Sequence, residues 1–302
     1  MNIPDNILDG RELSKKSYNT LTPRVKSLVL RGITPSLKII LIGAKPDSVV
    51  YTDMKRKRCE KLGIECDIIK LPSFIDAEAV CDIINDYNKN KSVHGIMVQL
   101  PLPIEMAGDT RKIVDTIHQG KDVDGLTSAN LGKIVAETIE INDLWNVPFF
   151  ISSTIYGILH FIASRDIDLV GKNVAVIGNS SLIGLPASII LSKLGATVEI
   201  SQIYTNNLSG RLSDRDIIIV GCGKRELIRG ESIKQGAIII DIGINVDINT
   251  ETGERKIYGD CNFEECRQKA GLITPVPGGV GPMTIYSLIE QLVKSAEASD
   301  YE

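Results

Sequence analysis

The chain has 302 residues, of which 43% are hydrophobic and 24% charged, and its formal net charge is −4. This length allows two domains that each bury a core, and the composition is that of an ordinary globular protein. The negative charge argues against a nucleic-acid partner, because a duplex binder needs a concentrated basic face.

No stretch approaches the roughly 18 continuous apolar residues that a membrane span needs, and the amino-terminal segment lacks an apolar signal core. We therefore expect a cytoplasmic protein without a membrane partner. The cysteines are scattered without a CxxC pair, which predicts reduced thiols and no metal site. They are Cys59, Cys66, Cys81, Cys222, Cys261 and Cys266.

Apolar runs alternate with helical patterns along the chain, which is typical of parallel sheets covered by helices. In the first half, the expected strands are 37–42, 66–69 and 95–98, and the expected helices are 48–62 and 76–87. In the second half, the expected strands are 173–177, 197–200, 217–220, 237–241 and 272–274, and the expected helices are 154–163 and 283–298.

This pattern predicts an α/β fold of two doubly wound domains with a cleft between them. The expected first domain comprises residues 1–148 together with the last helix, 283–302, which returns to it. The expected second domain, residues 149–282, has the Rossmann-type doubly wound pattern.

Tyr51 and Lys55 lie four residues apart in the expected helix 48–62, so they share one helix face. A lysine works as an acid or base when partial burial and neighbouring cations, here Arg56 and Lys57, lower its pKa toward neutrality. By spacing alone, a solvated basic helix is the more common explanation.

Two polar residues follow the expected strand 95–98. Gln99 comes directly after it, at the edge where doubly wound sheets bind ligands, and is either a functional or a capping amide. Asp124 lies in the charged turn 121–125, and a carboxylate can accept two hydrogen bonds from an amino-pyrimidinone edge. Asp-Gly is also a common turn signal, so this turn alone is weak evidence.

Two glycine-rich loops lie in the second half. Residues 178–186 join the expected strand 173–177 to a new helix, whose first N–H groups favour a pyrophosphate, although the spacing Gly-x-Ser-x-x-x-Gly departs from GxGxxG. Residues 273–284 are rich in glycine and proline, which brings bare backbone close to a ligand. A complex turn is the alternative explanation for this second loop.

Together these segments resemble the bifunctional methylenetetrahydrofolate dehydrogenase/methenyltetrahydrofolate cyclohydrolase family. The matching pieces occur in the family's order and cover nearly the whole chain. They are Tyr51-x-x-x-Lys55, the GIMVQLPLP run at 95–103, KDVDG at 121–125, DIGIN at 241–245 and PVPGGVGPMT at 275–284.

The resemblance implies oxidation of 5,10-methylenetetrahydrofolate to 5,10-methenyltetrahydrofolate with NADP or NAD, and hydrolysis of that product to 10-formyltetrahydrofolate. It places the protein in one-carbon metabolism and purine biosynthesis, with a folate as its small-molecule substrate and no metal. It also implies that residues 1–148 with the last helix, 283–302, form a folate-binding catalytic domain and that residues 149–282 form a Rossmann-type NAD(P)-binding domain. A homodimer that forms through the cofactor domains is implied as well.

The resemblance assigns roles to individual residues. Lys55 is the implied catalytic acid/base, Gln99 hydrogen-bonds it, Tyr51 orients the aminobenzoyl group, and Asp124 holds the pterin edge. The implied substrate-binding residues are Ser48, Tyr51, Val98, Leu100, Pro101, Asp124, Pro275, Gly278 and Gly279. The implied cofactor-binding residues are Thr154, Gly178, Asn179, Ser180, Ile183, Gly184, Ile244 and Thr284.

The chain departs from the family in the cofactor domain. Asn179 stands where the family usually has arginine, and Gln202 and Ile203 stand where it usually has histidine and serine. Loss of a guanidinium–phosphate contact forfeits about 1.5–3 kcal/mol. We therefore hypothesise a weakened preference for NADP, with NAD accepted instead.

Three charged residues bear on this hypothesis. Glu199 lies near the distance expected for a ribose-binding acid, although in a register that is too early. Lys224 and Arg225 are candidate substitute cations for a phosphate.

Three other functions are compatible with parts of the sequence. One is a cyclohydrolase with a weakened or lost dehydrogenase activity. Another is a non-catalytic nucleotide-sensing module, which has no evident need for Lys55 and Gln99 together. The third is a two-domain dehydrogenase of hydroxy acids, against which the KDVDG turn and the PVPGGVGP loop argue.

Overall fold

The computed structural model describes residues 6–140, 143–248 and 255–299. The chain forms two compact units, each assembled from several segments. The three-stranded unit comprises Lys16–Ala136, Val147–Ser153 and Ile285–Glu302, and the five-stranded unit comprises Met1–Lys15, Glu137–Asn146 and Thr154–Thr284.

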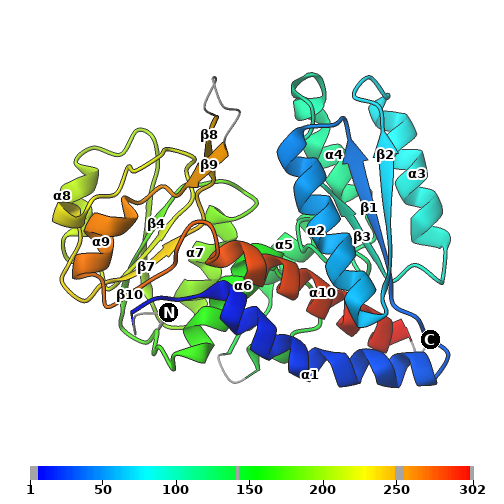
Figure 1. The fold of residues 1–302 in the computed structure, drawn as a ribbon, viewed down its shortest axis with the longest axis horizontal. Helices are drawn as coiled ribbons and strands as arrows, with labels where there is room; N and C mark the ends of the chain where they lie inside the picture. Colours follow the sequence, from blue (N-terminus) through cyan, green and yellow to red (C-terminus); the bar gives the residue numbers. More distant parts are fainter. Residues whose placement is uncertain (1–5, 141–142, 249–254, 300–302) are drawn as a thin grey trace. The chain divides into compact units, whose positions relative to one another are not determined.

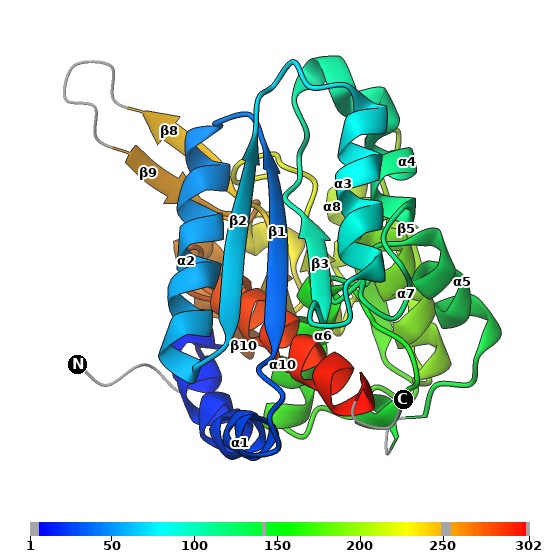
Figure 2. The ribbon, with the colours of Figure 1, turned by 90° about the vertical axis from the view of Figure 1, so that its right-hand side faces the viewer.

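The three-stranded unit is built on a parallel sheet with the strand order β2-β1-β3. Its strands are β1 (Ser36–Ile42), β2 (Glu65–Leu71) and β3 (Gly95–Val98), and its connecting helices are α2 (Pro46–Leu62) and α3 (Ala77–Lys89). Figures 1 and 2 show α2 and α3 on opposite sides of this sheet. The remaining elements are η1 (Ile104–Asp109), α4 (Thr110–Asp115) and α5 (Ser128–Ala136).

One face of this sheet carries an apolar core. Ile40, Ile96 and Val98 from the strands pack there against α3 and α4. Because side chains alternate along a strand, the neighbouring residues of β3 point to the other face. That face is the one that α2 covers.

Two long helices contribute to this unit. In α1 (Gly10–Leu30) the buried side chains recur every three or four residues and form one face; they are Ser14, Tyr18, Leu21, Val25 and Leu28. In the second half of α10 (Val280–Ala298), the Gln291 amide bonds the backbone of Ile151 and Val123, and the Ser295 hydroxyl donates to two further carbonyls. The last helix therefore packs in the three-stranded unit.

The five-stranded unit contains an all-parallel sheet with the order β10-β7-β6-β4-β5. Its strands are β4 (Asn173–Ile177), β5 (Thr197–Ser201), β6 (Ile217–Val220), β7 (Ile238–Asp241) and β10 (Leu272–Ile273). Its helices are α6 (Ser153–Ser164), α7 (Gly184–Lys193), α8 (Leu208–Leu212) and α9 (Phe263–Lys269), with 3-10 turns η2 (Leu144–Asn146) and η3 (Gly230–Ser232). A separate antiparallel hairpin joins β8 (Asn245–Ile248) to β9 (Arg255–Tyr258).

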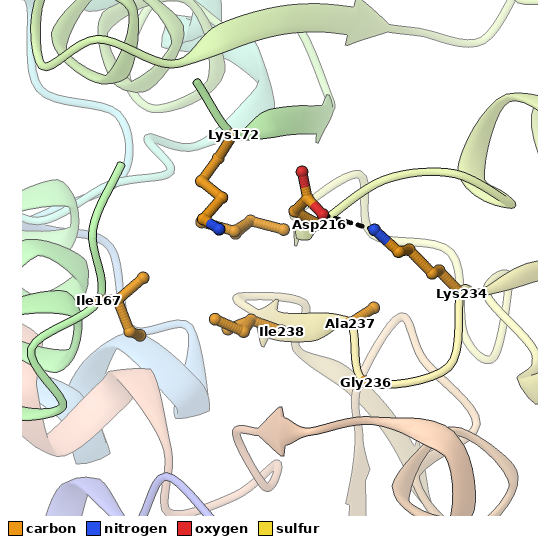
Figure 3. A pocket seen from close by; sticks show the side chains of 8 residues that line it. Ile167, Lys172, Asp216, Lys234, Gly236, Ala237 and Ile238 are labelled. Carbon is orange, nitrogen blue, oxygen red and sulfur yellow. Dashed lines mark hydrogen bonds and ion pairs between the residues drawn. The ribbon is translucent and has the colours of Figure 1, made fainter. Parts of the chain in front are cut away.

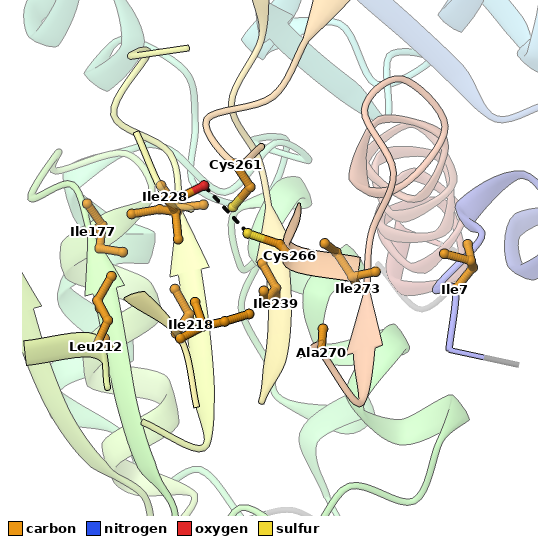
Figure 4. Packing of buried hydrophobic residues seen from close by; sticks show 13 residues of the cluster. Ile7, Ile177, Leu212, Ile218, Ile228, Ile239, Cys261, Cys266, Ala270 and Ile273 are labelled. Atoms are coloured by element: carbon orange, nitrogen blue, oxygen red, sulfur yellow. Dashed lines mark hydrogen bonds between the residues drawn. The ribbon is translucent and has the colours of Figure 1, made fainter. Parts of the chain in front are cut away.

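The core of the five-stranded unit includes a residue from the start of the chain. Ile7 packs with Ile239 and Ile273 in the cluster drawn in Figure 4. The backbone around Ile7 bonds to β10, because Leu8 N donates to Ile273 O at 2.8 Å and Ile273 N donates to Asn6 O at 2.9 Å. This segment thus extends the sheet beyond β10.

The predicted α/β class with parallel sheets in two units is confirmed, and each expected strand is present within one or two residues of its expected bounds. The sequence analysis did not predict α1 or the β8–β9 hairpin. The division of the described residues also differs from the expected one. Residues 6–15, 137–140 and 143–146 group with the five-stranded unit, and residues 149–153 group with the three-stranded unit. Among the described residues, no helix is both long and apolar enough to cross a membrane.

Candidate active site

Helix α2 presents a buried lysine toward the three-stranded sheet. Pro46 begins the helix at its first turn, and Gly63 ends it with a left-handed φ of 76°. Its buried residues, Ser48, Thr52, Lys55 and Cys59, are spaced four, three and four apart. Lys55 is only 5% exposed, which is rare for a lysine without a charged partner.

The end of β3 supplies the partners of Lys55. Its Nζ donates to Gln99 Oε1 at 2.9 Å and lies 3.6 Å from Met97 Sδ. Residues 97 and 99 reach the same face because they are two apart along the chain. Gln99 Nε2 donates to Leu100 O at 2.7 Å, which leaves its oxygen as the acceptor for Lys55.

The surroundings of Lys55 shift the balance of its amine toward the neutral form. Burial lowers its pKa, and Asp124 is the strongest charge that opposes this effect. The Tyr51 ring lies on the same helix, with its centroid 5.7 Å from Nζ. Burial also raises the pKa of the Tyr51 hydroxyl, so this ring stays uncharged beside the amine.

The turn that carries Asp124 is fastened by its neighbour. Asp122 is 1% exposed and accepts hydrogen bonds from Leu126 N, Thr127 N and Asn130 Nδ2. Burial raises the pKa of Asp122 to about 6. The Lys121 amine donates to three backbone carbonyls, so both of these charged residues hold the turn in place.

The other expected substrate residues of this unit differ in their placement. The Ser48 side chain is buried on the Lys55 face of α2, Leu100 is half-buried, and Pro101 is exposed. Val98 packs in the core on the α3 side, so its side chain points away from Lys55. Because side chains alternate along a strand, residue 97 lies on the same face as Gln99 and residue 98 on the opposite face. This alternation can be read from the sequence, and it favours Met97 over Val98 as the residue near Lys55.

The glycine-rich loop after β4 is closely packed. Gly178 has a left-handed φ of 118°, and a Cβ on Gly184 would lie 1.9 Å from Gly178 O. Ser180 Oγ accepts from Ile183 N at 3.2 Å and Gly184 N at 3.4 Å, and α7 begins at Gly184. This bare backbone before a helix fits a pyrophosphate, and Asn179 is exposed beside it.

Other expected ligand residues also belong to the five-stranded unit. The hydroxyls of Thr154 and Thr284 are 3.5 Å apart, and Ile244 is 55% exposed just beyond β7. Pro275, Gly278 and Gly279 lie in the loop after β10, whose Gly278 O accepts a hydrogen bond from Gly10 N at 2.9 Å.

Glu199 and Arg225, two of the three charged residues considered for ribose or phosphate contacts, have partners within the protein. Glu199 accepts hydrogen bonds from Arg211 at 2.8 Å and Arg215 at 2.6 Å. Arg225 pairs with Asp247, and its guanidinium stacks 3.5 Å from the Tyr258 ring centroid.

A cavity of about 130 Å³ lies at the opposite end of the five-stranded sheet (Figure 3). Lys172, Asp216 and Ala237 line it just before β4, β6 and β7, and Asp216 is paired with Lys234 at 2.6 Å. Open α/β sheets bind ligands at the carboxyl ends of their strands, so we do not place the active site in this cavity. Within the described part of the chain, no three His, Cys, Asp or Glu side chains gather as metal ligands would.

Comparison with known proteins identifies the family. Residues 8–124 match the description "Tetrahydrofolate dehydrogenase/cyclohydrolase, catalytic domain", and residues 152–300 match "Tetrahydrofolate dehydrogenase/cyclohydrolase, NAD(P)-binding domain". The chain belongs to the tetrahydrofolate dehydrogenase/cyclohydrolase family. The resemblance expected from five short segments is therefore confirmed over most of the sequence.

Individual members of the tetrahydrofolate dehydrogenase/cyclohydrolase family match the chain along its length. The bifunctional protein FolD of Moorella thermoacetica is 39% identical over 294 residues, covering 97% of this chain and 99% of FolD. The crystal structure of FolD from Campylobacter jejuni has a TM-score of 0.87 at 39% identity, covering 97% of this chain and 98% of that one. The Trypanosoma brucei enzyme, solved with NADP and an inhibitor, has a TM-score of 0.90 at 29% identity and covers 98% of both chains.

Proposed function

We propose that the protein oxidises 5,10-methylenetetrahydrofolate with a nicotinamide cofactor and hydrolyses the methenyl product to 10-formyltetrahydrofolate. The observation that carries this proposal is the buried Lys55 amine, which bonds to Gln99 at 2.9 Å and whose pKa is lowered by burial. Membership of the family supports both activities.

In the hydrolysis, Lys55 moves the protons. The Lys55 amine accepts a proton from the water that attacks the methenyl carbon, and the ammonium returns it to the ring nitrogen as the bond between that nitrogen and the carbon breaks. The remaining hydroxyl proton is released to solvent as the formyl C=O forms. Gln99 Oε1 holds the amine through its hydrogen bond, and its orientation is fixed by the bond from Nε2 to Leu100 O. The charge of Asp124 opposes the effect of burial and so limits how far the pKa of Lys55 falls.

In the oxidation, a nicotinamide cofactor held by the five-stranded unit would supply the acceptor for a hydride from the methylene carbon. The chain's own contribution is to bind and orient the two molecules. Gly178, Ser180 and Gly184 hold the cofactor's pyrophosphate, while Thr154, Ile183, Ile244 and Thr284 line the rest of its site. The loop fits a pyrophosphate because Gly184 packs directly against Gly178 and has no side chain to cover the backbone.

The residues that the family resemblance implies for folate binding occur in each of the two units. Asp124 accepts hydrogen bonds from the amino-pyrimidinone edge of the pterin, and Tyr51 stacks along the aminobenzoyl group. Ser48, Leu100 and Pro101 contact the folate from the three-stranded unit, together with the backbone of Val98. The loop residues Pro275, Gly278 and Gly279 contact it from the five-stranded unit.

The preference of this cofactor site is shifted toward NAD, in comparison with family members that carry an arginine at the position of Asn179. Asn179 presents no cation in the glycine loop, and Arg225 is already held by Asp247 and Tyr258. A 2'-phosphate on the ribose therefore lacks its usual guanidinium partner. Initial rates at matched, subsaturating cofactor concentrations test this preference; a large excess of the rate with NADP over that with NAD contradicts it.

One spectrophotometric experiment tests the main proposal. Methenyl formation from methylenetetrahydrofolate is followed with NAD and with NADP, and its decay is followed separately. We expect both steps in the wild-type protein and a loss of hydrolysis of about 100-fold or more in Lys55→Met. Hydrolysis without any NAD(P)-dependent step would select a cyclohydrolase alone, and unchanged hydrolysis in Lys55→Met would refute the role of the amine.

The protein also acts, in this proposal, as a homodimer in the cytoplasm. The family resemblance supports the dimer. The six cysteines are free thiols, as suits a reducing compartment such as the cytoplasm. Sedimentation velocity at micromolar concentration tests the dimer, and a monomer that retains full activity would refute it.

A further inference from the structure

Two buried carboxylates lie at the carboxyl edge of the five-stranded sheet and have no role in the chemistry above. Asp241 is the last residue of β7 and is 3% exposed, and Asp260 follows β9 and is fully buried. Among the described residues, neither is paired with a lysine or arginine. Burying two carboxyl groups without a paired cation is costly unless hydrogen bonds satisfy them, so the bonds that they accept are important to the fold or the function.

Asp260 joins the loops that follow two neighbouring strands. Its Oδ2 accepts hydrogen bonds from Cys222 N at 2.7 Å and Gly223 N at 2.9 Å, in the loop after β6. Its Oδ1 accepts from Asn245 Nδ2 at 2.8 Å, beyond the loop after β7. One side chain therefore fixes the spacing of these two loops.

Asp241 binds the backbone of the loop after β7 and the backbone at Asp260 itself. Its Oδ1 accepts from Gly243 N at 2.8 Å and from Asp260 N at 3.1 Å, while its Oδ2 accepts from Cys261 N at 2.8 Å. The packing leaves no room for added atoms. A Cβ on Gly243 would lie 2.3 Å from Asp260 Cγ, and one on Gly259 would lie 2.0 Å from Asp241 Oδ2.

The residue held between these contacts is Ile244. Gly243 is bound to Asp241, Asn245 is bound to Asp260, and Ile244 between them exposes 55% of an apolar side chain. A large exposed apolar side chain on backbone fixed at both ends is suited to contact a flat ligand. The carboxyl edge of the sheet is where such a ligand binds.

We propose that Asp260, supported by Asp241, is a positioning residue for the dehydrogenase half of the reaction: it sets the Ile244 segment and the 221–223 loop against the cofactor. The inference rests on the proposed function, because it requires that the five-stranded unit bind NAD(P). It assigns no part in hydrolysis to either carboxylate, since Lys55, Gln99 and Asp124 all belong to the three-stranded unit.

The test separates the two activities in Asp260→Asn, which preserves shape but cannot accept all three hydrogen bonds. We expect the KM for the cofactor to rise about tenfold or more, since bonds to a charged acceptor are lost. The kcat/KM for methenyl hydrolysis should stay within about twofold of the wild-type value. Asp216→Asn, at the opposite edge of the same sheet, is the matched control and should change neither.

A second variant guards against misfolding. Asn245→Ala removes only the donor to Asp260 and two weaker backbone contacts, and it should raise the cofactor KM in the same direction by a smaller factor. Thermal unfolding confirms that each variant is folded. The inference is wrong if both folded variants keep the wild-type cofactor KM. It is also wrong if hydrolysis falls in parallel with oxidation. If Asp260→Asn does not fold, the result for Asn245→Ala decides between these outcomes.

Failure of the proposed function has a different signature. In that case the wild-type protein itself would show no NAD(P)-dependent oxidation. Fluorescence titration with NADH then measures cofactor binding directly. Weaker binding by Asn245→Ala supports the positioning role, and unchanged binding overturns it.

Discussion

Lys55 illustrates how a functional residue destabilises the fold that holds it. Its pKa is lower in the folded chain than the ordinary value of 10.5. Between these two pKa values the unfolded chain binds a proton that the folded chain does not, so this residue reduces stability there. The reduction shrinks as the pH rises toward 10.5.

We therefore predict that Lys55→Met, which loses hydrolysis, is more stable than the wild-type protein at pH 7. Methionine fills a similar volume and needs no partner in the contact with Met97. Urea midpoints measured at pH 7 and near pH 10 check this, and the difference should decrease at the higher pH. A destabilised variant at pH 7 would show that the Gln99 bond outweighs the cost of burial.

Asn179 is the residue at which cofactor preference can be changed. Asn179→Arg adds a guanidinium beside the bare backbone of the glycine loop, and we expect kcat/KM with NADP to rise about tenfold or more. The value with NAD should change little. Asn173→Arg, on an exposed position at the amino end of β4, adds the same charge elsewhere and serves as the control.

If both substitutions raise the NADP value equally, general charge attraction explains the effect. The geometry of the loop would then have no part in phosphate recognition.

At the scale of elements, the start of α1 is closely packed against the PVPGG loop. A Cβ on Gly10 would lie 1.8 Å from Gly279 O. Alanine normally stabilises a helix relative to glycine. Here the clash forces the loop or the helix to move, and overpacking of this kind typically destabilises by about 1–3 kcal/mol.

We predict that Gly10→Ala lowers stability and raises the KM for the folate, because Gly279 lies in the proposed folate contact. Gly132→Ala in α5 is the control, since its Cβ would meet no atom within 4 Å. That substitution should stabilise the protein by about 0.5–1 kcal/mol. Thermal unfolding and steady-state kinetics of the two variants give opposite results if the packing argument is correct.

The strands were predictable because each is a short apolar run bounded by turn residues, and fully buried parallel strands such as β6 have this pattern. Helix α1 was missed because its sequence is largely polar and contains Pro23, although its buried residues keep a helical spacing. The pairing of Lys55 with Gln99 followed from recognised motifs. The Asp241–Asp260 contacts could not be predicted, because they join residues whose loops meet only in the folded sheet.

At the scale of the whole molecule, the chain changes unit at residues 15/16, 136/137, 146/147, 153/154 and 284/285. The last segment completes the three-stranded unit. Its Leu288, Ile289, Leu292 and Val293 are all fully buried. A Cβ on Gly95 of β3 would lie only 2.6 Å from Leu292 Cδ1, which shows how closely this helix packs.

We predict that a chain ending at Thr284 does not fold its three-stranded unit. Each of the four lost side chains contributes about 1.5–3 kcal/mol, and a domain is typically stable by only about 5–15 kcal/mol. Circular dichroism during urea unfolding, with an assay of hydrolysis, checks this result. A chain ending at Ser299 keeps every described residue and should behave as wild type, and a folded, hydrolytically active Thr284 chain would contradict the prediction.

The interleaving of segments has a consequence for anyone who wishes to obtain one activity without the other. No single cut releases either half with all of its own sequence, so gene fission at a natural boundary would yield two incomplete products. Monofunctional descendants of such a chain have to arise through point changes within an intact polypeptide.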